Sequence, residues 1–397
     1  MSHHPPSLDD ILASKTAAAM PFAATLPAVE LRHYFQAIDN MIKVFAFREG
    51  DEVLFLTDPL LDRRVVDAIS GIAAARGARV REFMGESSQI SVIPDEAKPA
   101  LEKATFVVST WFASTGSPFA NKLRRETGQR WIKITYFRNL DLLYTPQARF
   151  PIDLVGEIIR ATARLYPRDN EFDMTFADQR GTDLTIHFTP EMVTNLLDHN
   201  RWRGENTGDT PGCYVHYLPT HGPNIYAHTC FKRDPHAKPQ MQGVIFPQWA
   251  IGFDKPFAEK IGIEYKDGYV NKVHGRSLDA EILRDMLVGV DAFLHELGCG
   301  HNPKAPRFAA YPAGSNSPGA LHFGTDGNRP SEYLRRKIPN WEEPHVHQDC
   351  VIFDATVKAG NTTLIDNGFL MSLRDPQVVA AASRYGDPID LLESFVQ

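Results

Sequence analysis

The pattern of apolar residues changes at about residues 166 to 170, and this change limits the possible folds more than any other feature. Before it, short apolar runs alternate with segments of helical spacing. After it, strict alternation of apolar and polar residues is common, as in strands with one buried face. The chain has 397 residues, more than one core usually serves. We therefore expect two domains, residues 1–166 and 167–397.

The first domain is expected to be an α/β domain built on a parallel sheet. Val53 to Leu56 is a short apolar run, and the stretch after Pro59 has its apolar residues on one helical face. Gly77 then ends that helix. Further strands are expected at Arg79 to Phe83, Phe106 to Val108 and Trp131 to Phe137, followed by a helix from Ile152 to Leu165 that Pro167 ends.

The second domain is expected to be mostly antiparallel β and to carry a metal site. Strands are expected at Phe172 to Phe176, at Leu184 to Phe188 and in a hairpin from Ile263 to Val270 with an Asp-Gly turn. A helix is expected from Asp279 to Leu297, because Ile282, Met286 and Val290 continue an apolar stripe. Residues 201–241 and 299–331 show no clear period, as is usual for loops that form sites.

Charge and cysteine content exclude several classes of protein. The net charge is −7 without a run of Lys or Arg, so we expect no binding to nucleic acid or to an anionic membrane surface. The first ten residues include two acids, and no apolar stretch approaches ~20 residues, which predicts a cytoplasmic protein. The four cysteines, Cys213, Cys230, Cys299 and Cys350, form no C-x-x-C pair and are expected to be buried free thiols.

A group of polar residues leads into the apolar run that starts at Cys350. In a strand, His345, His347 and Asp349 would project from one face because they are two residues apart. An imidazole and a carboxylate at this spacing can bind one cation of the Mn, Fe, Co or Zn type, with the second histidine as support. The alternative is that all three are solvated or hydrogen-bonded residues.

Two further residues have the same chemistry. Glu296 follows an apolar stretch and precedes two glycines, where a buried carboxylate would need a partner. His322 lies in a short apolar run between Gly319 and Gly324, where close backbone approach is permitted. An exposed glutamate and a hydrogen-bonded core histidine are the alternatives.

The order of these motifs resembles the thermophilic aminopeptidase T family of metallopeptidases. The motifs are E-L-G-x-G at Glu296, G-x-x-H at His322 and H-x-D at His347, and the segments from Gly50 and Gly181 also match. The resemblance spans most of the chain. It implies four metal ligands, namely Glu296, His322, His347 and Asp349.

Two departures from the family pattern change the expected chemistry. The peptidases hold two metal ions and use a glutamate where this chain has Gln242, so we expect one divalent ion per chain. A family tyrosine is replaced by Arg329, which removes a hydroxyl and adds a cation that can bind a carboxylate through two hydrogen bonds. Gln242 and Arg329 are therefore expected to contact the substrate.

Two other groups resemble this branch of the fold: 2,5-dihydroxypyridine 5,6-dioxygenases and 5-nitroanthranilate aminohydrolase. The dioxygenases have a histidine at the position of Glu296, so the retained carboxylate favours hydrolysis. We expect an enzyme that replaces an aromatic amine by hydroxyl on a small ring bearing a carboxylate. Glu296 is the expected catalytic ligand, and His228 and His345 are candidates for the general base.

The identity of the metal and the oligomeric state are also expected from the resemblance to this family. Mn is favoured, with Fe(II) or Zn as alternatives, and the relatives suggest a homo-oligomer. Three other functions stay open at this stage: an Fe(II) ring-cleaving dioxygenase, a metalloaminopeptidase and a binding protein without metal.

Overall fold

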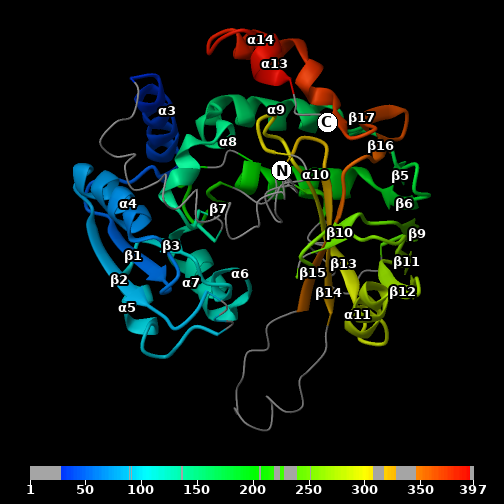
Figure 1. The fold of residues 1–397 in the computed structure, drawn as a ribbon, viewed down its shortest axis with the longest axis horizontal. Helices are drawn as coiled ribbons and strands as arrows, with labels where there is room; N and C mark the ends of the chain where they lie inside the picture. Colours follow the sequence, from blue (N-terminus) through cyan, green and yellow to red (C-terminus); the bar gives the residue numbers. More distant parts are fainter. Residues whose placement is uncertain are drawn as a thin grey trace, which may run out of the picture.

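The computed structural model describes residues 28–88, 90, 92–135, 137–204, 207–218, 224–227, 239–250, 252–306, 317–327 and 346–393. In this part of the chain, five strands form a parallel sheet and thirteen strands form an antiparallel sheet. Figure 1 shows the two sheets in separate halves of the molecule. The expected fold class, an α/β unit followed by a mostly antiparallel β unit, is confirmed.

The parallel sheet has the strand order β2-β1-β3-β4-β7. Its strands are β1 (Glu52–Thr57), β2 (Arg79–Met84), β3 (Phe106–Ser109), β4 (Arg130–Lys133) and β7 (Tyr214–His216). The helices between them are α4 (Arg63–Ala75), α5 (Lys98–Lys103), α6 (Ala113–Gly116) and α7 (Pro118–Thr127). Buried residues of α4 pack on one face of the sheet, and those of α5 and α7 pack on the other. Such two-sided cover is typical of parallel sheets.

Local chemistry explains why these elements begin and end where they do. The side chain of Asp62 accepts a hydrogen bond from the backbone N–H of Arg64 and caps α4. Gly77, at φ +76°, takes the left-handed conformation that follows the helix, as the sequence predicted. The strand expected from Trp131 to Phe137 is shorter, since β4 ends at Lys133.

Two segments cross the expected domain boundary at residues 166 to 170. Strand β7 comes from beyond it, yet pairs with β4 in the parallel sheet. Helix α9 (Ile152–Arg164) comes from before it, yet its buried residues join the hydrophobic core of the antiparallel sheet. The two sheets are therefore connected by more than one passage of the chain.

The antiparallel sheet has the order β10-β15-β14-β13-β12-β11-β9-β6-β5-β16-β17-β18, and β8 also pairs with β13. Its strands are β5 (Phe172–Ala177), β6 (Asp183–Phe188), β8 (Asn224–Ala227), β9 (Met241–Ile245), β10 (Trp249–Ala250), β11 (Gly262–Lys266), β12 (Tyr269–His274), β13 (Phe293–Cys299), β14 (Leu321–Gly327), β15 (Val346–Ile352), β16 (Thr356–Ala359), β17 (Thr362–Asp366) and β18 (Phe369–Leu370). The expected strand pair at β5 and β6 and the hairpin of β11 and β12 are confirmed. The expectation of irregular structure is wrong for β7, β8 and β14.

The helix expected from Asp279 to Leu297 is also wrong. Helix α11 covers only Leu278–Leu287, and Glu296 lies in strand β13. Gly289 at φ +76° and Asp291 at φ +50° take left-handed backbone conformations that a helix cannot continue through. The buried face of α11 is also different, because Ile282 is exposed.

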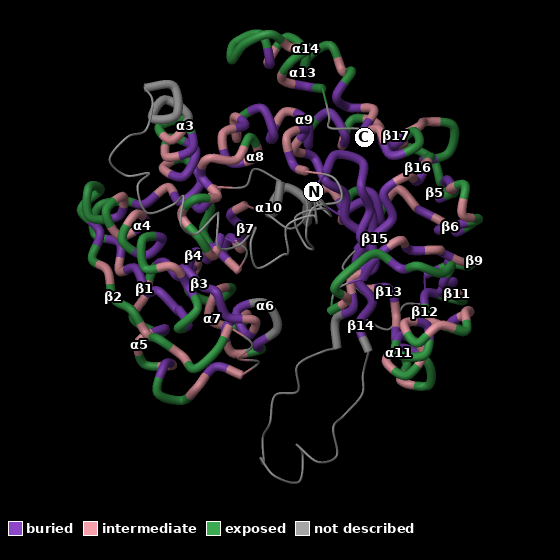
Figure 2. The backbone as a smooth tube through the Cα atoms, in the orientation of Figure 1, coloured by how far each residue is buried: buried purple, intermediate pink, exposed green. Residues whose placement is uncertain are grey.

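The remaining elements cover the two sheets. They are α3 (Ala28–Phe45), η1 (Leu140–Tyr144), α8 (Pro146–Arg149), α10 (Pro190–Gly204), η4 (Met371–Arg374), α13 (Pro376–Ala382) and α14 (Pro388–Leu392). Figure 2 shows buried residues along the central strands and exposed residues on outer helices such as α14. None of the helices in the described ranges is both long and apolar enough to cross a membrane.

Candidate metal centre

The candidate site lies on three adjacent strands, β13, β14 and β15. In this ladder Gly324 of β14 is opposite Glu296 on one side and Asp349 on the other. One step along, His322 is opposite Gly298 and Val351. Residues directly opposite in an antiparallel ladder share a face, and so do residues two apart on one strand. Glu296, His322 and Asp349 therefore meet on one face around a residue without a side chain.

A β-bulge in β13 gives this face a further polar residue. The register shifts between Leu294 and Glu296, so His295 is an extra residue in the strand. Leu294 is buried on the core side, whereas His295 lies 3.2 Å from Asp326 through its Nδ1 atom. Bulges commonly redirect side chains in this way next to functional sites. Because of the shift, the side chains of two consecutive residues, His295 and Glu296, both lie on the face of the sheet that carries the site.

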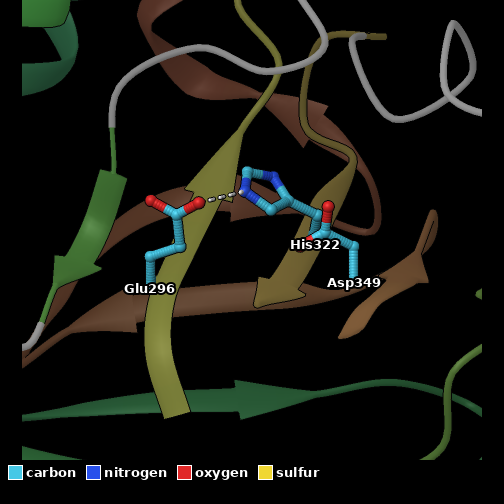
Figure 3. A group of neighbouring side chains, drawn as sticks. All are labelled: Glu296, His322 and Asp349. Atoms are coloured by element: carbon cyan, nitrogen blue, oxygen red, sulfur yellow. Dashed lines mark ion pairs between the residues drawn. The ribbon is translucent and has the colours of Figure 1, made fainter. Parts of the chain in front are cut away.

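The three side chains are close enough to bind one ion. One potential ligand atom from each of Glu296, His322 and Asp349 lies within 4.8 Å of the others. The Nε2 atom of His322 is 3.9 Å from Oε1 of Glu296, the contact that Figure 3 marks. Glu296 and His322 are 5% and 1% exposed, and Asp349 is half-buried, so the group lies mostly below the surface. Little bulk water then competes for the ligand atoms.

Gly298 makes room for the ring of His322. A Cβ atom at residue 298 would lie 2.7 Å from both ring nitrogens and still closer to Cε1. Any larger residue would thus displace the imidazole from its place beside Glu296. The glycine of the E-L-G motif is explained by this contact rather than by a turn.

The donor atoms, and the space that Gly298 leaves for the ring of His322, fit a divalent metal ion. Two carboxylates and one imidazole are ligands that Mn, Fe and Zn accept, and carboxylate oxygens suit Mn in particular. The neighbouring cysteines lie on the other face of the sheet, because Cys299 is opposite Leu321 and Cys350 is opposite Phe323. Burial raises the pKa of Cys350 and raises that of Cys299 to about 12. The described cysteines, Cys213, Cys299 and Cys350, are buried free thiols as expected, and Cys230 lies outside the described residues.

Asn224 also belongs to the site, although sequence reasoning missed it. Its Nδ2 atom donates a hydrogen bond of 3.0 Å to Oε2 of Glu296, and both residues are buried. The signal in the sequence was the apolar run Ile225 to Ala227, which follows Asn224 and forms strand β8 together with it. His295, Asp326 and Gly298 were likewise not singled out, because only strand register reveals their positions.

The structure brings together three of the predicted site residues. Glu296, His322 and Asp349 form the group, and the backbone of His347 belongs to β15, opposite Asp326. The side chain of His347 and the residues His228, Arg329 and His345 lie outside the described part of the chain. Gln242 is exposed on β9, and β11 and β12 lie between that strand and β13. It is not part of the group.

Comparisons with known proteins give a fold but no family. No protein-family model and no curated protein matches the chain. The solved structure of 2,5-dihydroxypyridine dioxygenase from Pseudomonas putida KT2440 aligns with a TM-score of 0.58 and 15% identity, over 89% of this chain and 99% of that one. Wild-type AmpT from Thermus thermophilus aligns with a TM-score of 0.46 and 15% identity, over 86% and 100%. The chain thus has the fold of the dioxygenase.

Proposed function

We propose that the protein is a metal-dependent enzyme that replaces an aromatic amine by hydroxyl and releases ammonia. The observation that carries this proposal is the group of buried Glu296, buried His322 and half-buried Asp349, whose ligand atoms lie within 4.8 Å of one another. A fold shared with an enzyme named for a dihydroxypyridine supports a ring-shaped substrate. The proposed substrate class is a small aminobenzoate with an electron-withdrawing nitro group.

The reaction consumes one water and yields one ammonia. Water oxygen bonds to the ring carbon that carries the amine, and the C–N bond breaks with its electron pair leaving on nitrogen. One proton of the water moves to that nitrogen, which leaves as ammonia, and the ring keeps the hydroxyl. A divalent ion in the site would lower the pKa of a bound water and polarise the ring substituents. The residues of the site would hold that ion, His347 included, with one ion per chain and Mn as the favoured metal.

Several residues have proposed roles in binding and proton transfer. Arg329 would bind the carboxylate of the substrate, and Gln242 stays a proposed contact. His228 and His345 are proposed for proton transfer. His295 is added to them because Asp326 lies 3.2 Å from its Nδ1 atom, an arrangement that orients the ring.

An Fe(II) ring-cleaving dioxygenase is the second candidate, and the TM-score of 0.58 favours it. The ligand type argues against it, because Glu296 brings a second carboxylate to the site beside Asp349. Many Fe(II) oxygenases use two histidines and only one carboxylate. A metalloaminopeptidase and a binding protein without metal remain less supported. A cytoplasmic location and a homo-oligomer are further proposals.

One experiment separates these functions. Purified protein is freed of metal, loaded with Mn, Fe(II) or Zn, and given an aminobenzoate that bears a nitro group. Ammonia release without O2 uptake is the expected result. Oxygen consumption without ammonia would replace this proposal by the dioxygenase, and two ions per chain with peptide cleavage would replace it by the peptidase.

A further inference from the structure

We propose that Asn224 is a positioning residue that restricts Glu296 to binding a single ion through its Oε1 atom. The inference rests on the proposed metal centre, and it concerns how the protein sets the affinity and number of ions there. Asn224 would contact neither the ion nor the substrate. It acts through Glu296.

The contact geometry separates the two oxygens of Glu296. Oε2 accepts the 3.0 Å hydrogen bond from Asn224, and Oε1 lies 3.9 Å from Nε2 of His322. A carboxylate has no hydrogen to donate, so the NH2 group of Asn224 must be the side that faces it. That amide group carries partial positive charge, which disfavours a second cation at Oε2. Oε1 is left on the side of His322 and Asp349.

Strand register explains how Asn224 reaches this position. In the pairing of β8 with β13, Tyr226 is opposite Leu297 and Asn224 is opposite Gly298, so Ile225 is an extra residue. Without this bulge, Ile225 would stand opposite Gly298. The bulge therefore moves an amide into the position that faces the site. It complements the bulge at His295 on the partner strand, which directs Glu296 to the same face.

Burial makes the hydrogen bond costly to lose. Asn224 is 1% exposed and Glu296 is 5% exposed, so water cannot readily replace the amide donor. Hydrogen bonds to ligating carboxylates orient them, and their removal typically costs 10- to 100-fold in metal affinity. We expect that range for Asn224→Ala.

The test measures Mn2+ binding to the full chain by calorimetric titration, with folding checked by circular dichroism. The wild-type protein should bind one ion, and Asn224→Ala should weaken binding by roughly 10- to 100-fold. In a Glu296→Asp background, which keeps a carboxylate but withdraws it from the Asn224 amide by one methylene, the same Asn224→Ala change should have little further effect. Thr325→Val is the matched control: Thr325 is equally buried, one residue from the site, and bonds Tyr265 on the core face.

Each outcome decides the question. Unchanged affinity in Asn224→Ala, an equal loss in both backgrounds, or two ions per wild-type chain would overturn the inference. An equal loss of affinity in Thr325→Val would assign the effect to general destabilisation and also overturn it. If one ion binds as expected but no ammonia is released from any aminobenzoate, the proposed reaction fails while the role of Asn224 stands. If no divalent ion binds, both proposals fall.

Discussion

Carboxylates below the surface have different partners in the two sheets. In the parallel sheet, Asp51 lies 2.5 Å from Arg130, and the two side chains are 8% and 5% exposed. Asp58, fully buried, lies 2.5 Å from Arg138. Although burial opposes it, hydrogen bonds from Arg138 and Thr110 hold the pKa of Asp58 below its usual range. Each buried acid of this sheet is matched by a guanidinium group.

In the antiparallel sheet, two carboxylates approach one imidazole instead. Glu296 and Asp349 both lie within 4.8 Å of His322 in their ligand atoms, and Glu296 has the neutral amide of Asn224 as its hydrogen-bond donor. In the parallel sheet, an arginine of the chain itself supplies the positive charge next to each buried acid. The group around His322 is instead suited to bind a cation from solution. The comparison separates charges that stabilise the fold from charges arranged for binding.

The largest expected effect is loss of the metal on replacing Asp349. Asp349→Ala removes one of the three clustered ligands, and we expect the protein to retain no Mn2+ after dialysis, as measured by elemental analysis. Asp366→Ala, at an exposed position of β17, is the control and should keep the ion. Metal retention by Asp349→Ala would show that the ligand set is different.

The next effect concerns stability rather than binding. Arg130→Met leaves the buried Asp51 carboxylate without its guanidinium partner, which should lower the free energy of unfolding by about 3–5 kcal/mol. Urea denaturation measures this loss, and Mn2+ affinity should not change. Arg79→Met, which breaks the exposed pair with Glu52, should cost far less. If Arg130→Met changed the affinity for Mn2+, the ion pair of the parallel sheet would not be independent of the metal site in the antiparallel sheet.

The sequence predicted the parts of the fold and site that depend on local pattern. Strands β1, β2 and β3, the hairpin and the candidate ligands Glu296, His322 and Asp349 all follow from periodicity or from short motifs. The helix expected up to Leu297 failed, because an apolar stripe can continue past the left-handed residues Gly289 and Asp291 that end the helix.

What could not be predicted depends on pairing between distant segments. Strand β7 joins the parallel sheet from beyond the expected boundary, and no local signal specifies that partner. The bulges at His295 and Ile225 exist only relative to the neighbouring strands. Asn224 and Asp326 therefore became recognisable as site residues only when the register was known.

His301 is a buried ionisable group of a third kind: among the described residues it has no charged partner like those of Asp51 and Asp58, it is not part of the metal-site group, and it stays neutral. Burial lowers its pKa to about 4, against the opposing bond to the Cys299 carbonyl. The unfolded chain, with a pKa near ~6.5, binds a proton that the folded protein excludes, so stability should fall as pH drops from about 6.5 to 4. The loss reaches about 3 kcal/mol at the lower limit.

The measurement is urea denaturation of metal-free protein at several pH values across this window. His301→Gln should flatten the dependence, because an amide can bond the Cys299 carbonyl and Thr162 without titrating. A dependence of equal steepness in the variant would assign it to other groups.

The smallest expected effects come from two glycines, one in each region, that receive the same added methyl group. Gly298→Ala places a Cβ 2.7 Å from the ring nitrogens of His322, and such overpacking should cost about 1–3 kcal/mol and weaken Mn2+ binding. Gly71→Ala, in α4, meets nothing within 4 Å and should stabilise the protein by about 0.5–1 kcal/mol without affecting the ion. Thermal unfolding and Mn2+ titration of both variants measure these opposite signs. If Gly298→Ala binds Mn2+ as tightly as the wild-type protein, the position of His322 does not depend on this glycine.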